Sequence, residues 1–307
     1  MKLNLPSPIQ EIQDKCLSKA EVRLYIKRDD LIHPSVSGNK WRKLKYNLLQ
    51  AQKASQSTIL TYGGAFSNHI YSVAAAGKVL GFPTIGIIRG EENRILNPTL
   101  SFAQESGMKL YFVSRNDYRD KIKAFEVVKE SLDDCYILPE GGTNAFALPG
   151  CGEIVQEVQE QWKEGLPDYW CLSCGTGGTI AGIISAMPDK EGTVLGFSAL
   201  KGDFHQNDIQ QLLEEFKLPI PSNWSIQTDY HFGGYARYQP SLIDFINEFK
   251  SVHQIQLDPI YTGKLFYGIF DLVKKGYFKK GSKILAIHTG GLQGIVGFNQ
   301  RFGDILK

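Results

Sequence analysis

The fold of this chain is decided by residues 169–179, which read YWCLSCGTGGT and lead from an apolar strand into a glycine-rich turn. A helical pattern follows over residues 180–187. Glycines let backbone N–H groups converge on an anion without interference from a Cβ atom, threonine hydroxyls add donors, and the helix contributes its positive N-terminus. The passage lacks the Gly-Lys-Ser/Thr ending of a Walker loop and the glycine spacing of the dinucleotide fingerprint. It therefore predicts an α/β protein with a candidate cradle for a phosphate group.

Short apolar or β-branched runs alternate with helical patterns along the rest of the chain. This alternation predicts open, mostly parallel sheets that are flanked by helices on both faces, with ligands at the carboxyl ends of the strands. The predicted strands are residues 58–60, 83–88, 110–113, 135–138, 169–173, 194–199 and 284–288.

A second informative stretch is SGNKWRK at residues 37–43. Ser37, Gly38 and Asn39 favour turns and helix N-caps. We therefore expect the ammonium of Lys40 near the positive end of a helix over residues 41–50. This placement favours the neutral amine, which imine formation with an aldehyde such as pyridoxal phosphate requires. Taken alone, however, the stretch fits an ordinary cationic helix start better.

A third segment, TYGGAFSNH at residues 61–69, follows a predicted strand and precedes an alanine-rich helix over residues 71–80. The Asn68 amide could hold a phenolic oxygen, and the Ser67 hydroxyl could bond a carboxylate or attack a substrate. The alternative is a well-capped helix with a structural histidine at His69. Only the joint occurrence of the three segments favours a functional site.

These segments give the chain a resemblance to the fold-type II pyridoxal phosphate enzymes. Within them, it resembles the branch that holds 1-aminocyclopropane-1-carboxylate deaminase and D-cysteine desulfhydrase. The resemblance implies pyridoxal 5′-phosphate as cofactor, a homodimer, and two domains with open, twisted, mostly parallel sheets. The large cofactor-binding domain would comprise residues 1–42 plus 144–307, and the small inserted domain residues 43–143, with the cofactor in the cleft between them. The segments that match the family are residues 26–30, 37–43, 63–69, 138–144, 173–179, 232–236, 258–264 and 288–291.

The resemblance also implies roles for single residues. Lys40 would be the lysine that forms the Schiff base with the cofactor, and Asn68 would bond the cofactor's 3′-oxygen. Ser67 resembles the serine that meets the substrate carboxylate or acts as nucleophile. Tyr235 and Tyr261 resemble two tyrosines that crowd the reacting carbons, although a tyrosine in an α/β protein is more often a packed core residue. The implied phosphate ligands are Lys43, Cys174, Gly175, Thr176, Gly177, Gly178 and Thr179. The implied substrate-binding residues are Ser67, Asn68, His69, Gly142 and Thr143.

Thr262 separates the two activities of this branch. In the family, the residue after Tyr261 faces the pyridine nitrogen of the cofactor, and we expect a glutamate there in the cyclopropane deaminases. A carboxylate would keep that nitrogen protonated and strengthen the electron sink, whereas a threonine offers a neutral hydroxyl. Opening a cyclopropane ring needs the stronger sink, because there is no α-hydrogen to remove.

The threonine therefore resembles the desulfhydrase pattern, in which D-cysteine gives pyruvate, hydrogen sulfide and ammonia. Lys40 would then be the base for the α-proton, and Tyr261, or less favourably Tyr235, would donate a proton to the leaving sulfur. Deamination of 1-aminocyclopropane-1-carboxylate is the alternative activity. A non-catalytic relative that binds pyridoxal phosphate or another phosphate ligand is the alternative from a different class.

The composition narrows the classes of function and partner that remain. With 34 basic and 32 acidic residues among 307, the chain has no charge excess to attract nucleic acid or an anionic membrane. Five cysteines without a disulfide-framework spacing predict reduced thiols and a cytoplasmic protein. Cys171 and Cys174 lack a second pair, and the histidines show no ligand spacing, so no metal is predicted. The sequence shows neither an apolar signal core nor a run of about 18 apolar residues, so neither export nor a membrane span is predicted.

Overall fold

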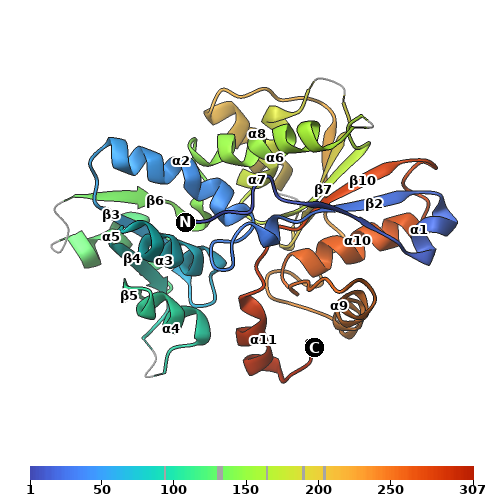
Figure 1. The fold of residues 1–307 in the computed structure, drawn as a ribbon. Helices are drawn as coiled ribbons and strands as arrows, with labels where there is room; N and C mark the ends of the chain where they lie inside the picture. The colour runs from blue at the N-terminus through green and yellow to red at the C-terminus, as the bar shows by residue number, and fades with distance from the viewer. Residues whose placement is uncertain (93–94, 130–133, 164, 189–190, 203–204) are drawn as a thin grey trace.

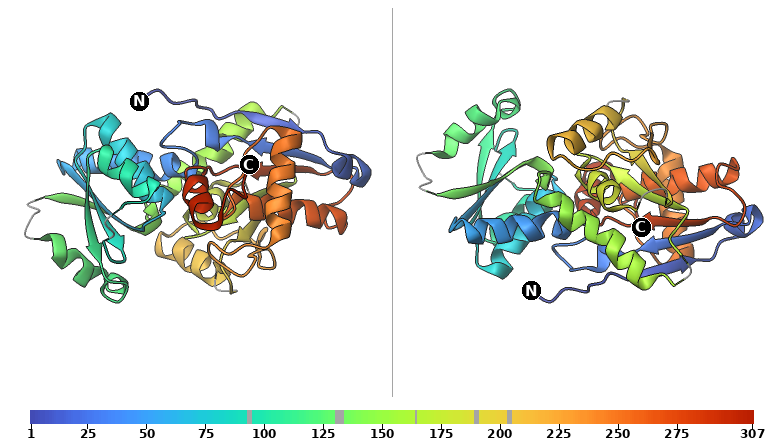
Figure 2. Two further views of the ribbon diagram at one scale, coloured as in Figure 1. Left: turned by 90° about the horizontal axis from the view of Figure 1, so that it is seen from below. Right: turned by 90° about the horizontal axis from the view of Figure 1, so that it is seen from above.

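The computed structural model describes residues 1–92, 95–129, 134–163, 165–188, 191–202 and 205–307. Two separate sheets, each flanked by helices, form two lobes that lie side by side (Figure 1). Figure 2 shows the same division from two further directions. No helix in these parts of the chain is both long enough and apolar enough to cross a membrane.

The large lobe is built on a six-stranded sheet with the order β1-β2-β10-β7-β8-β9. Neighbouring strands are parallel except at the edge, where β1 runs antiparallel to β2. The mostly parallel arrangement confirms the predicted fold class. The strands are β1 (Ile9–Ile12), β2 (Arg23–Lys27), β7 (Tyr169–Cys174), β8 (Thr193–Ser198), β9 (Trp224–Gln227) and β10 (Lys283–Ile287).

Both faces of the large sheet are buried. In β10, Leu285 and Ile287 pack into the core beneath α6, α7 and α8, whereas Ile284 and Ala286 pack into the core beneath α1, α9 and α10. A strand covered on both faces reads as a continuous apolar run, and from such runs the sequence predicts the central strands β7, β8 and β10. The central strand β2 was not predicted, because charged residues bound its short apolar run. The helices are α1 (Lys15–Ala20), α6 (Ala147–Gln161), α7 (Gly178–Ala186), α8 (His205–Glu215), α9 (Pro240–His253) and α10 (Thr262–Lys274).

The small lobe is built on a four-stranded parallel sheet with the order β5-β4-β3-β6. Apolar residues of α2, α3 and α4 cover one face, and those of α5 cover the other. The four strands fall within the predicted insertion of residues 43–143, and the domain boundaries themselves stay a proposal. The elements are β3 (Thr58–Gly64), β4 (Thr84–Arg89), β5 (Met108–Val113), β6 (Cys135–Leu138), α2 (Asn39–Lys53), α3 (Asn68–Leu80), α4 (Pro98–Glu105) and α5 (Lys121–Lys129).

Two helices connect the lobes. Helix α2 contributes to the core of the small lobe and also packs against α6 of the large lobe. Helix α11 (Gly294–Phe302) of the chain's C-terminal part lies against α4, where the Thr99 hydroxyl donates to Gln293 Oε1 at 2.8 Å. The carboxyl ends of β3, β7 and β10 therefore carry their turns toward a shared region where the lobes meet.

Candidate active site

The turn after β7 has the shape of an anion-binding cradle. Gly177 is the N-cap of α7 with φ +77°, in the left-handed region that favours glycine. A Cβ atom at Gly175 would lie 3.1 Å from the Tyr261 ring, and one at Gly178 only 2.6 Å from Thr143 Oγ1. Side chains at these positions would therefore crowd Tyr261 and Thr143, so the close packing of this turn requires glycine. A strand, a glycine turn and a helix N-terminus in this order are typical of an anion site.

Lys43 places a positive charge beside this turn. Its ammonium is buried and donates to Thr143 Oγ1 at 2.9 Å, Thr176 Oγ1 at 3.1 Å and the Gly141 carbonyl at 3.2 Å. Burial lowers the pKa of Lys43 below its ordinary value. A phosphate dianion at the turn would replace part of the lost solvation, so Lys43 stays in our proposed phosphate site together with the turn.

Lys40 is the second residue of α2, one residue after the helix begins at Asn39. Gly38 precedes the helix with φ +63°, and a Cβ atom there would lie 2.0 Å from the Thr289 carbonyl oxygen. The loop after β10 therefore crosses directly over the start of this helix. Burial and the neighbouring charge of Lys43 lower the pKa of Lys40 to about 7. No hydrogen-bond partner holds its Nζ among the described residues, so the amine is available to react.

The lowered pKa of Lys40 predicts how the apoprotein takes up pyridoxal phosphate. Only the neutral amine attacks an aldehyde, so we expect the uptake rate to rise about tenfold between pH 6 and pH 8 and then to level off. Stopped-flow absorption of the lysine-bound cofactor measures this rate. A lysine peptide with the ordinary pKa is the control, because its rate keeps rising well above pH 8. A protein profile that follows the peptide would contradict the lowered pKa.

The turn after β3 places Ser67 and Asn68 at the start of α3. Ser67 is the N-cap, and its Oγ accepts a hydrogen bond from the Ile70 N–H at 3.3 Å. The side chain of Asn68 is half-buried and has no hydrogen-bond partner in the described parts of the chain. The Asn68 amide, the hydroxyl proton of Ser67 and the N–H groups of Asn68 and His69 can therefore meet a polar ligand, and the roles of these residues stay predictions.

His69 is a neutral acceptor in this region. Its Nε2 lies 2.8 Å from Thr61 Oγ1, and that hydroxyl donates to the Leu138 carbonyl at 2.9 Å. Because the hydroxyl proton is used there, we assign the imidazole proton to Nε2 and an open lone pair to Nδ1. Burial, helped by the charges of Lys40 and Lys43, lowers the pKa of His69 well below 6.5.

Tyr235 and Tyr261 lie edge to face, with their ring centroids 6.3 Å apart. Tyr261 is the N-cap of α10, and Tyr235 lies in the loop before α9, where 46% of the residue is exposed. Burial raises the pKa of both phenols, for Tyr261 well above 10. Both hydroxyls therefore keep their protons at neutral pH, which suits a proton donor and not a general base.

The hydroxyl of Thr262 is committed to Asp258. It donates to Asp258 Oδ2 at 2.6 Å and accepts the Asp258 N–H at 2.9 Å. The same carboxylate accepts N–H groups of Ile260, Tyr261 and Thr262, and so caps the start of α10. Sequence analysis assigned no role to Asp258, although an aspartate ahead of a helix start is an N-capping signal. The Thr262 hydroxyl oxygen keeps one lone pair, which can still accept a hydrogen bond.

These residues fit a bound pyridoxal phosphate. The glycine turn and Lys43 match its phosphate, and the unpaired amine of Lys40 matches its aldehyde. Two buried polar atoms near the turns, Ser173 Oγ and His69 Nδ1, have no partner among the described residues. A polar ligand bound between the turns would offer hydrogen-bond partners to these two atoms. In the described parts of the chain, no group of three or more His, Cys, Asp or Glu residues is arranged to hold a metal ion.

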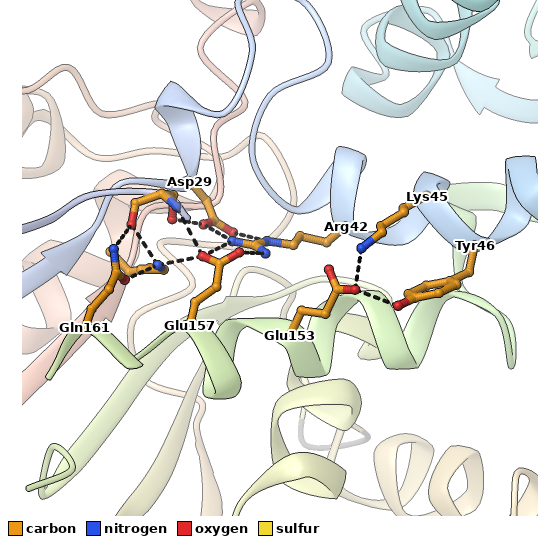
Figure 3. Close-up of polar contacts among 9 residues, drawn as sticks. Asp29, Arg42, Lys45, Tyr46, Glu153, Glu157 and Gln161 are labelled. Carbon is orange, nitrogen blue, oxygen red and sulfur yellow. Dashed lines mark hydrogen bonds and ion pairs between the residues drawn. The ribbon is translucent and has the colours of Figure 1, made fainter. Parts of the chain in front are cut away.

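A buried ion network fixes the Lys40 helix to the large lobe, as Figure 3 shows. The Arg42 guanidinium, fully buried, bonds both oxygens of Asp29 and both oxygens of Glu157. Lys27 donates to Glu157 Oε2 at 2.7 Å and to the Ser7 carbonyl at 2.7 Å. No sequence pattern predicts this network, because Arg42 and Glu157 are 115 residues apart.

A surface hollow of about 360 Å³ lies at the opposite edge of the large sheet from these turns. Its lining includes Pro167, Asp168 and Gly192, which precede β7 and β8. Ligands of parallel sheets bind at the carboxyl ends of the strands, so we place the active site at the turns around Lys40 and not in this hollow.

Comparisons with known proteins identify the relatives of this chain. Residues 3–290 match the sequence family described as Pyridoxal-phosphate dependent enzyme. A protein of Pyrococcus abyssi (strain GE5 / Orsay), provisionally named 1-aminocyclopropane-1-carboxylate deaminase, is 33% identical over 301 residues, covering 93% of this chain and 89% of its own. A bifunctional, mitochondrial D-cysteine desulfhydrase/1-aminocyclopropane-1-carboxylate deaminase of Arabidopsis thaliana is 30% identical, covering 95% of this chain and 78% of its own. The crystal structure of an ACC deaminase homologue matches with a TM-score of 0.86 at 29% identity, covering 100% of this chain and 95% of that chain.

Proposed function

Because this chain belongs to the pyridoxal-phosphate dependent enzymes, with pyridoxal 5′-phosphate as cofactor, we propose that it deaminates a small amino acid by α,β-elimination. D-Cysteine is the proposed substrate, and pyruvate, hydrogen sulfide and ammonia are the proposed products. The bifunctional plant relative supports this class of reaction by its name. The choice between its two activities depends on the residues around Thr262.

The observation that carries the choice of D-cysteine is the bonding of Thr262 to Asp258. The family resemblance puts this position at the pyridine nitrogen of the cofactor. A glutamate here would bring a second carboxylate against the buried Asp258, and two like charges in a buried site are costly. The surroundings thus favour a neutral residue, and a neutral residue favours a substrate with an α-hydrogen and a good leaving group.

Each proposed step belongs to a residue with suitable chemistry. When bound, the cofactor supplies an electron sink for negative charge at the substrate α-carbon. Lys40 Nζ holds the cofactor and, once released, takes the α-proton, for which a pKa of about 7 is well matched. Ser67 Oγ, Asn68 and the N–H groups at the start of α3 bind the substrate carboxylate. The protonated Tyr261 hydroxyl gives its proton to the departing sulfur, with Tyr235 as the second candidate.

A parallel assay of four compounds on the purified holoenzyme tests the proposal. The compounds are D-cysteine, L-cysteine, D-serine and 1-aminocyclopropane-1-carboxylate. We expect pyruvate and hydrogen sulfide from D-cysteine and no 2-oxobutyrate from the cyclopropane. Efficient formation of 2-oxobutyrate would show that Thr262 does not decide the activity.

The second candidate function is the deamination of 1-aminocyclopropane-1-carboxylate. The names of the Pyrococcus abyssi and Arabidopsis thaliana relatives favour it, and the same assay separates it from the first. Turnover of none of the compounds would favour the non-catalytic alternative. The predicted homodimer and cytoplasmic location stay predictions.

A further inference from the structure

Lys264 is a buried lysine for which the proposed reaction has no use. It lies in the first turn of α10, two residues after Thr262, and is only 1% exposed. Its ammonium donates to three backbone carbonyls: His231 at 2.8 Å, Gly234 at 2.8 Å and Ala199 at 3.3 Å. An ammonium has three N–H donors, so these carbonyls account for all of them. Burial lowers the pKa of Lys264 to about 8, although Asp258 opposes the shift.

Two of these carbonyls belong to the loop that carries Tyr235. The loop has positive φ at Phe232 (+52°), Gly233 (+94°), Gly234 (+115°) and Ala236 (+53°). For the two residues other than glycine this backbone conformation costs free energy, so it persists only where neighbouring contacts hold it. The Lys264 ammonium supplies such contacts on both sides of Gly233.

The third carbonyl lies at the end of a strand of the large sheet, and the lysine itself belongs to a helix. Ala199 follows β8 directly, and α10 begins at Thr262 with Tyr261 as its N-cap. The ammonium thus joins the loop of Tyr235 to the helix of Tyr261, whose rings lie 6.3 Å apart. We propose that Lys264 is a positioning residue that acts as an internal monovalent cation, gathering three carbonyls to hold Tyr235 against Tyr261.

The proposal predicts that a free cation can replace the lysine. Converging backbone carbonyls are ligands for potassium, and ammonium donates to the same oxygens. Lys264→Ala would leave a space lined by the three carbonyls, which ammonium or potassium could enter. Lys264→Met keeps a side chain of similar length without charge, so it would fill the space and exclude a cation.

Limited trypsin digestion of the holoenzyme measures whether the loop is held, because the exposed Arg237 directly follows it. We expect cleavage after Arg237, mapped by mass spectrometry, to be about tenfold faster in both variants than in the wild type. Ammonium and potassium chloride should restore protection to Lys264→Ala in a saturable manner, and lithium chloride at equal ionic strength should not. Lys264→Met should respond to none of these salts.

Lys250→Ala is the matched control. Lys250 also donates to a main-chain oxygen, that of Lys307 at 2.6 Å, but this contact is exposed and involves no residue of the tyrosine loop. Its digestion should equal that of the wild type in every salt.

Three outcomes would overturn the proposal. The first is cleavage of a folded Lys264→Met after Arg237 at the wild-type rate. The second is equal protection of Lys264→Ala by lithium and by ammonium, and the third is protection of Lys264→Met by ammonium. Should Lys264→Ala fail to fold on expression, its refolding yield from urea in ammonium chloride against lithium chloride gives the same test. A higher yield in ammonium supports the proposal, and equal yields overturn it.

The catalytic consequence rests on the proposed function, whereas the digestion does not. If D-cysteine is the substrate, kcat of Lys264→Ala should fall about tenfold and recover with ammonium over the same concentration range as the protection. If ammonium protects Lys264→Ala from trypsin but the wild type does not turn over D-cysteine, the proposed function is refuted and the role of Lys264 is left intact. If the loop of Lys264→Ala is cleaved faster but its kcat equals that of the wild type, Lys264 does not act through Tyr235.

Discussion

Lys40→Ala is expected to abolish both turnover and covalent attachment of the cofactor. Lys40 is the lysine at the start of α2 with an unpaired amine and a pKa lowered to about 7. Its neighbour Lys43 donates to three oxygens, so we do not expect it to take over the bond to the aldehyde. Loss of a covalent catalytic group typically costs at least about a thousandfold in kcat. The visible absorption of the lysine-bound cofactor should disappear from the purified protein, and borohydride reduction should no longer leave a label on the peptide that contains position 40.

Lys45→Ala is the matched control for this experiment. Lys45 lies on the same helix, but its ammonium is paired with Glu153 and is partly exposed. The control should keep the absorption, the label and the turnover. A wild-type protein whose borohydride label maps to another lysine would refute the proposed site. A labelled Lys40 without turnover of any amino acid would instead favour a non-catalytic protein that binds pyridoxal phosphate.

The sequence predicted strands with an uninterrupted apolar run better than strands that contain charged or polar residues. Strand β6 was predicted over residues 135–138 and is observed at Cys135–Leu138, because an apolar run between turns has few alternatives. Strands β1, β2 and β9 were missed. Strand β2 (RLYIK) is central and largely buried, but its apolar run is only three residues long and lies between two charged residues. Strands β1 and β9 lie at the two edges of the large sheet. Each has four residues, mostly half-buried and partly polar, so neither contains a run that differs from a loop. Their pairing comes from the neighbouring strands and not from their own composition.

The candidate site was predictable where its residues lie at the carboxyl ends of strands. Parallel sheets carry these ends to the same edge, which is why Gly142, after β6, lies against His69, after β3. Lys43 instead meets Thr176 from helix α2, which joins the two lobes. The roles assigned to these residues stay predictions. The contacts of Lys264 were not predictable, because the direction of three backbone carbonyls depends on positive φ values that the residue types do not specify.

The ion network around Arg42 was missed for a related reason. A sequence pattern distinguishes apolar from polar faces, and it counts Arg42 among the polar residues of a cationic helix start. In the fold this side chain is fully buried between Asp29 and Glu157. A buried charge is recognisable only when its partners are known, and here they come from η1 (Asp29–Leu31) and from α6.

Arg42→Met is therefore expected to be the most destabilising substitution near the active site. Burial alone would lower the pKa of Arg42, but Asp29 and Glu157 more than offset this effect and raise it. Removing the guanidinium leaves two carboxylates facing each other without their common partner, and such a loss typically costs about 3–5 kcal/mol. Urea denaturation followed by fluorescence measures the loss as a lower transition midpoint.

A second variant and a control separate the lost pairing from the lost packing. Glu157 keeps Lys27 as a partner, whereas Asp29 pairs with no other cation among the described residues. Arg42→Met combined with Asp29→Asn removes the stranded charge, so we expect it to recover part of the stability that Arg42→Met loses. Lys45→Met breaks the partly exposed pair with Glu153 on the same two helices, and should cost at most about 1 kcal/mol. Equal losses for Arg42→Met and Lys45→Met would mean that the buried network does not anchor α2. Because Lys40 lies two residues before Arg42 on that helix, the alignment of the reactive amine would then need another cause.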